Sequence, residues 1–185
     1  PDVEVIMMTG HGDLDLAIEK YETVRKGNPK NLGIAVLIAT LYEKKGEPVK
    51  AKAIYEDILS KDPNVDVAAN NLAFFLAEYD PTPENLARAR KLIDPLLDRH
   101  KGVPQVVDTG AWVYYRLGKF DKAGELLATI EKDRQEVPAI SYHSGMVHLK
   151  LGDKAKAKEY LQTAVKSQEA FPGKEEAAKT LKDLG

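Results

Sequence analysis

The segment GKFDKA at residues 118–123 decides the fold, because it returns in nearly the same form as GDKAKA at residues 152–157. Two earlier segments, GDLDLA at 12–17 and GEPVKA at 46–51, have the same spacing from glycine to alanine. The four glycines are separated by 34, 72 and 34 residues, and 72 leaves room for two units and four extra residues. The chain is therefore predicted to repeat a unit of about 34 residues.

Each repeat is predicted to form two helices joined by a tight turn. Apolar residues follow helical spacing over residues 31–46 and again over residues 47–60. Gly46 is expected to end the first helix in the left-handed conformation that glycine adopts at little cost. Small residues at Ala39 and Ala51 would let the two helices approach closely. The predicted repeat is a helical hairpin.

A hairpin of this length and composition resembles the tetratricopeptide repeat (TPR) family. The residues that carry the resemblance are Ala39, Tyr42, Gly46, Ala51, Tyr55 and Pro63 in one repeat, and Ala111, Tyr114, Gly118 and Ala123 in another. The resemblance implies an all-α fold, a right-handed α-solenoid of TPR hairpins with a C-terminal capping helix. It divides one continuous domain into a truncated first repeat at 1–31, repeats at 32–65, 66–103, 104–137 and 138–171, and the capping helix at 172–185.

The repeat at 66–103 departs from the others. Asp80 replaces its turn glycine, and four residues are inserted around residues 79–84, which corresponds to about one helical turn. The second helix is expected to resume at Asn85, and Pro95 is expected to kink or shorten it.

The two ends of the chain carry separate expectations. In the capping helix, the predicted apolar face consists of Ala177, Ala178, Leu181 and Leu184. Pro1 falls inside the first helix of the truncated repeat, so upstream repeats are expected in a longer parent chain.

The composition argues against several classes of protein. The 27 Lys and Arg residues nearly balance the 29 Asp and Glu residues, so nucleic acid and anionic membranes are not expected as partners. The chain has no cysteine, which excludes disulfides, thiolate metal sites and cysteine nucleophiles. Its longest apolar runs, such as residues 34–39, are far shorter than a membrane span, so direct membrane insertion is not expected.

No residue pattern predicts an enzyme, a cofactor or a metal site. Phosphate-binding, dinucleotide-binding and nucleophile-elbow motifs are absent from the sequence. His143 and His148 are five residues apart and do not share a helical face, and His148 is expected to pack in the core. The stretch at 1–13 also resembles the segment around the switch threonine of bacterial response-regulator receiver domains, with Thr9 as that threonine. The acidic pocket and phosphoacceptor of a receiver are missing upstream, which disfavours this alternative.

The TPR resemblance implies that the first helix of each hairpin lines a concave groove that binds protein segments. Counting from the turn residues places Glu78 in this groove, together with the candidate partner-binding residues Asn70, Phe74, Asp108, Trp112, Tyr115, Arg116, Tyr142 and Met146. Trp, Tyr and Arg often dominate the binding energy at interfaces. The alternative is that these aromatic residues pack against neighbouring helices.

The same resemblance indicates which kind of protein segment the groove is expected to bind. Family members that grip a C-terminal carboxylate use Lys and Asn residues along the groove, and of these only Asn70 is matched here. An extended or helical apolar segment is therefore expected in place of a free C-terminus.

The predicted function is a non-catalytic protein–protein interaction scaffold that binds a peptide or protein segment in its groove. The alternative is a structural spacer or self-assembly array, associating through its truncated N-terminal end. Residues 70–73 and 107–118 resemble the C-terminal repeats of long bacterial TPR proteins, some of them envelope lipoproteins of exopolysaccharide and protein-sorting systems. This resemblance leaves the bacterial periplasm or envelope and the cytoplasm open as locations.

Overall fold

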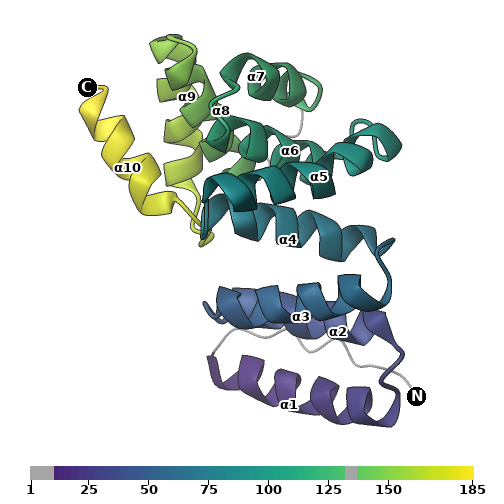
Figure 1. The fold of residues 1–185 in the computed structure, drawn as a ribbon. Coiled ribbons are helices and arrows are strands. Elements are labelled where there is room, and N and C mark those ends of the chain that lie inside the picture. The colour runs from purple at the N-terminus through teal and green to yellow at the C-terminus, as the bar shows by residue number, and fades with distance from the viewer. Residues whose placement is uncertain (1–10, 132–136) are drawn as a thin grey trace. The chain divides into compact units, whose positions relative to one another are not determined.

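The computed structural model describes residues 11–131 and 137–185, and they form helices joined by short turns (Figure 1). The expectations about Pro1, Thr9 and the receiver-like stretch fall on residues 1–10, outside the described part. The chain divides into two compact units, an N-terminal unit up to Leu72 and a C-terminal unit from Ala73 onward. The all-α fold class is confirmed for the described residues.

The described residues of the N-terminal unit form three helices and the start of a fourth. Their bounds are α1 His11–Gly27, α2 Leu32–Lys44, α3 Pro48–Lys61 and α4 Asp66–Glu78, the last of which continues into the C-terminal unit. The side chain of Asn31 caps α2 by accepting a hydrogen bond from the backbone N–H of Ile34. Between α2 and α3, Gly46 has a φ of 78° as predicted, and Ala39 and Ala51 are fully buried.

Gly12 differs from the other repeat glycines. It lies inside the first turn of α1, whereas Gly46, Gly118 and Gly152 precede second helices with positive φ angles. The repeat spacing therefore aligns Gly12 with the turn glycines of the other repeats, but Gly12 does not share their positive φ angle.

In the C-terminal unit, the residues that the structure describes form the end of α4 and six further helices. Their bounds are α5 Pro83–Arg99, α6 Pro104–Arg116, α7 Phe120–Ala128, α8 Pro138–Lys150, α9 Lys154–Lys166 and α10 Lys174–Asp183. Helices α6 and α7 pack as one pair and α8 and α9 as another, while α6 also contacts α8. Gly145 of α8 lies directly against Leu161 and the backbone of Ala157 in α9, which brings these two helices close together. The helices lie within the predicted repeats, and the boundaries between the repeats stay a prediction.

Helix α5 corrects the start that was predicted from the sequence, and the kink predicted at Pro95 stays a prediction. The helix begins at Pro83 and not at Asn85, because the Thr82 side chain accepts a hydrogen bond from the Asn85 N–H and caps the helix. The inserted residues thus lengthen the start of the helix. Pro95 lies inside α5 without ending it, and the helix continues to Arg99.

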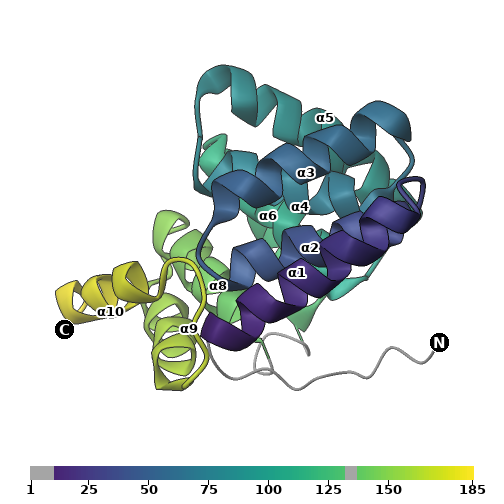
Figure 2. The same ribbon diagram turned by 90° about the horizontal axis from the view of Figure 1, so that it is seen from below.

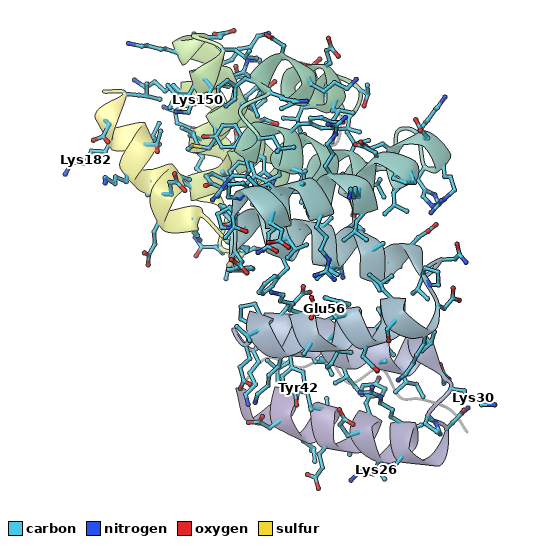
Figure 3. All side chains as sticks on the ribbon, in the orientation of Figure 1. Lys26, Lys30, Tyr42, Glu56, Lys150 and Lys182 are labelled. Carbon is cyan, nitrogen blue, oxygen red and sulfur yellow. The ribbon has the colours of Figure 1, made fainter. Side chains whose placement is uncertain are left out.

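Helix α10 lies beside α9 and also contacts α8 (Figures 1 and 2). Gly173 precedes it with a φ of 87°, and Ala177 is fully buried. Ala178 is exposed, so the predicted apolar face was wrong at this position. Exposed lysines such as Lys150 on α8 and Lys182 on α10 lie on the outside of their helices (Figure 3).

Candidate partner-binding face

The aromatic residues predicted from the repeat phase gather around Trp112 in the C-terminal unit. The Trp112 ring stacks on Tyr115 of the same helix, with centroids 4.7 Å apart and planes 7° apart. On α8, the ring of His143 lies 4.1 Å from Trp112 and that of Tyr142 lies 5.4 Å from it. Two more rings lie at the edges, Phe74 at 6.0 Å from His143 and Phe171 at 5.9 Å from Tyr142. We call these six residues the aromatic cluster.

The members of the aromatic cluster differ in exposure. Trp112 and Tyr142 are 1% and 0% exposed, so both pack against their neighbours. Phe74, Tyr115 and Phe171 are half-buried. Any contact with a partner would therefore begin at these three rings, and the role of Trp112 and Tyr142 in binding stays a prediction.

Two carboxylates hold the buried rings in place. Trp112 Nε1 donates a hydrogen bond of 2.8 Å to Glu78 Oε2 at the end of α4. Tyr142 Oη donates one of 2.7 Å to Glu176 Oε2 on α10. Burial and these nearby carboxylates raise the pKa of the Tyr142 hydroxyl, so it remains a donor at neutral pH. We call Glu78 and Glu176 the acidic rim.

Both of these bonds link residues that are 34 positions apart in the sequence, which is one repeat for Tyr142 and Glu176 and four residues less than the longer repeat between Glu78 and Trp112. Each bond therefore joins a first helix to the corresponding helix of the next repeat, α4 to α6 and α8 to α10. Helix α10 takes the place of another first helix, and for this reason its Glu176 reaches Tyr142.

Asp108 and His143 form a buried polar pair between α6 and α8. His143 Nδ1 lies 2.8 and 3.0 Å from the two carboxylate oxygens of Asp108, and His143 is 1% exposed. Its other nitrogen, Nε2, is buried without a hydrogen-bond partner in the part of the chain that the structure describes. In the sequence analysis His143 was considered only as a metal ligand, so its place in the cluster was missed.

The remaining predicted residues lie in different surroundings. Arg116 Nη1 is 3.7 Å from Glu78, and its guanidinium lies 5.8 Å from the centre of the Trp112 ring. Met146 is buried in α8. Asn70 belongs to the N-terminal unit, where its Nδ2 donates to Asn71 Oδ1.

Glu176 and Phe171 are members of the site that the sequence analysis did not assign. A signal for them was present, because Pro172 continues the 34-residue spacing of Pro104 and Pro138. Continuing that phase into the capping helix places Glu176 at the position of Tyr142, one repeat later.

Residues 11–131 and 137–185 contain neither a cluster of metal-binding side chains nor a membrane-spanning helix. This part of the chain contains no group of three or more His, Cys, Asp or Glu side chains that could hold a metal ion. None of its helices is long and apolar enough to cross a membrane. His148 is only partly buried, with its ring 5.3 Å from that of Tyr160, so it packs at the edge of α8 and α9 and not in the core.

Comparisons with known proteins concern the repeat family and the fold of the chain. Two family profiles, both described as tetratricopeptide repeat, match residues 8–73 and 109–175. A thermophilic TPR protein of Thermus thermophilus has a similar solved structure, with a TM-score of 0.68 and 18% identity over 94% of this chain and 91% of that chain. No curated protein matches the chain in sequence.

Two further solved structures share the fold. PilW, a widely conserved type IV pilus biogenesis factor, has a TM-score of 0.67 and 19% identity over 93% of this chain and 80% of its own. MamA has a TM-score of 0.61 and 20% identity over 95% of this chain and 99% of its own. Together with the two profile matches and the repeated hairpins, these similarities show that the chain belongs to the tetratricopeptide repeat family and has its helical solenoid fold.

Proposed function

We propose that the C-terminal unit binds a peptide or protein segment over its aromatic cluster. TPR proteins are generally non-catalytic scaffolds for protein–protein interaction, which supports the general part of this proposal. The observation that carries the specific part is the gathering of aromatic and charged side chains from α4, α6, α8 and the α10 segment on one face.

The accessible part of this face has the composition of an interface. Tyr115 and Arg116 are half-buried on the last turn of α6, with Trp112 packed beneath both. Tyr and Arg side chains at such positions often contribute most to binding. A segment that covers them would bury their remaining surface without displacing Trp112 from its bond to Glu78.

The proposal is tested by replacing accessible residues, because removing Trp112 or Tyr142 would open a cavity in the core. We expect Tyr115→Ala combined with Arg116→Ala to lower the capture of partners from a lysate of the source organism by at least about tenfold. Tyr160→Ala on α9 is the matched control and should capture them as the wild type does. Equal capture by all three proteins would refute binding at this face.

A second candidate function is self-association of the N-terminal unit. Leu16 and Val24 on α1 are 48% and 53% exposed, which leaves two large apolar side chains on one helix. Light scattering over a hundredfold concentration range tests this candidate. Self-association is supported if the mass of the wild type rises with concentration while the Leu16→Glu variant keeps the mass of a monomer. A wild type that keeps the mass of a monomer throughout would exclude it.

A further inference from the structure

The aromatic cluster is surrounded by more negative than positive charge. Glu78 and Glu176 approach it from α4 and α10, and Asp108 is buried beside His143. Arg116 offsets part of this charge at 3.7 Å from Glu78. Lys174 lines the same surface hollow as Glu176, and its amino group donates to the backbone oxygens of Ser167 and Glu169.

The polar groups around the aromatic cluster include several hydrogen-bond acceptors. His143 Nδ1 faces the two carboxylate oxygens of Asp108. The other nitrogen, Nε2, is buried, has no partner among the described residues, and belongs to a ring that lies between Trp112, Tyr142 and Phe74. The carboxylates of the acidic rim and of Asp108 only accept hydrogen bonds when ionised, so the cluster is suited to a ligand that brings donors.

The aromatic faces fit a cation as well. The guanidinium of Arg116 already lies over the Trp112 ring at 5.8 Å, within the range of a cation–π contact. At the other side of the cluster, Glu176 is exposed and lines a surface hollow of about 520 Å³ together with Phe171 and Gly173. A side chain can therefore reach Glu176 from solvent.

We infer that this face selects a segment with a Lys or Arg side chain, which is received between the acidic rim and the half-buried rings of Tyr115 and Phe171. The inference rests on the proposed function and specifies its ligand. Charge complementarity selects this occupant over a neutral apolar segment or an acidic one.

The chain supplies its own reporter for a test, because Trp112 is the only tryptophan. The probes are four acetylated, amidated pentapeptides, Leu-Ala-X-Ala-Leu, in which X is Arg, Lys, citrulline or Glu. Citrulline keeps the shape of Arg and lacks its charge. We expect saturable changes in Trp112 fluorescence with the Arg and Lys peptides, and an affinity at least about tenfold higher than for citrulline or Glu.

The matching variant is Glu78→Gln with Glu176→Gln. Glutamine retains an acceptor oxygen for Trp112 and Tyr142, so the fold should be kept while two charges are lost. The tenfold preference for Arg and Lys should disappear. Glu125→Gln with Glu159→Gln removes two exposed charges from α7 and α9 and should keep the preference.

The inference is overturned by any of three results. These are equal responses to all four wild-type titrations, including no response at all; a preference for citrulline or Glu; or an unchanged preference in the Glu78→Gln, Glu176→Gln protein. If that double variant still captures natural partners while the Tyr115→Ala, Arg116→Ala protein does not, the cation inference fails and the proposed function stands. If neither pair of substitutions reduces capture, both fail.

Discussion

Tyr142 has three roles in the C-terminal unit. Its ring packs between Trp112 and Phe171, its hydroxyl donates to Glu176, and the backbone of Gly173 lies directly against it. A Cβ at Gly173 would come within 2.2 Å of this ring, so both the positive φ and the contact require glycine there. The repeat phase predicted that Tyr142 lies on the inner face of its helix, but it carried no information about what covers that face.

At the scale of single residues, Glu43 makes stability depend on pH. It is half-buried near the end of α2, and burial raises its pKa from 4.5 to about 7, although a hydrogen bond with Tyr55 lowers it. Between these two values the folded chain holds a proton that the unfolded chain has released. The stability that this proton provides is therefore complete below pH 4.5 and is lost as the pH rises through about 7.

We expect Glu43→Gln to remove this dependence. The variant should be more stable than the wild type at pH 8, by roughly 1–2 kcal/mol given the partial exposure of the group, and similar to it at pH 5. Urea unfolding followed by circular dichroism at both pH values measures the difference. Glu19→Gln, an exposed carboxylate of α1, is the control. A stability difference that is the same at both pH values would argue against this role.

At the scale of helices, α8 and α9 of the C-terminal unit approach each other closely at Gly145. A Cβ at Gly145 would lie 2.7 Å from Leu161 Cγ, 2.9 Å from its Cδ2 and 3.2 Å from the backbone oxygen of Ala157. Because Leu161 is fully buried and a backbone oxygen cannot turn aside, the helices themselves would have to separate.

We therefore expect Gly145→Ala to destabilise the chain by about 1–3 kcal/mol, in spite of the better helix propensity of alanine. Gly124→Ala on α7 is the matched control. Its Cβ would meet Leu151 Cδ1 at 3.0 Å, but Leu151 is 40% exposed and free to move. This control should be neutral or slightly stabilising in the same urea titration. A reversed order of the two variants would show that α8 and α9 are less tightly packed than described.

Sequence predicted the helices better than it predicted their environments. The hairpins followed from spacing alone, because glycine and proline positions and helical periodicity are local properties of the chain. The predicted start of α5 was wrong because the capping role of Thr82 was not recognised. The predicted burial of Ala178 was wrong because an apolar residue was assumed to face the core.

The site was predictable only in part, for a different physical reason. Phase from the turn residue selects the side of a helix, and Trp112, Tyr115 and Tyr142 are indeed brought together. The depth of burial depends on how neighbouring helices stack, and a single sequence contains no such distances. The place of His143 in the aromatic cluster also depends on two contacts, with the Trp112 ring and with the Asp108 carboxylate.

At the scale of the whole chain, a repeat array transmits a change mainly to neighbouring repeats, since each repeat contacts only those next to it. Helix α10 contacts α8 and α9 and carries Glu176 of the acidic rim, and the segment before it carries Phe171 of the aromatic cluster. Removing residues 169–185 would uncover Tyr142 and leave its hydroxyl without this acceptor.

We expect this truncation to lower the protection of amide hydrogens strongly in α8 and α9, by about tenfold or more, and to leave α2 and α3 unchanged. Hydrogen exchange measured by mass spectrometry resolves these helices separately. Lys179→Ala with Lys182→Ala, which changes only exposed side chains of α10, is the control and should leave every helix protected. An equal loss of protection in α2 and α3 would mean that the array unfolds as one cooperative body. Unchanged protection in α8 would mean that α10 adds nothing to the stability of the face it covers.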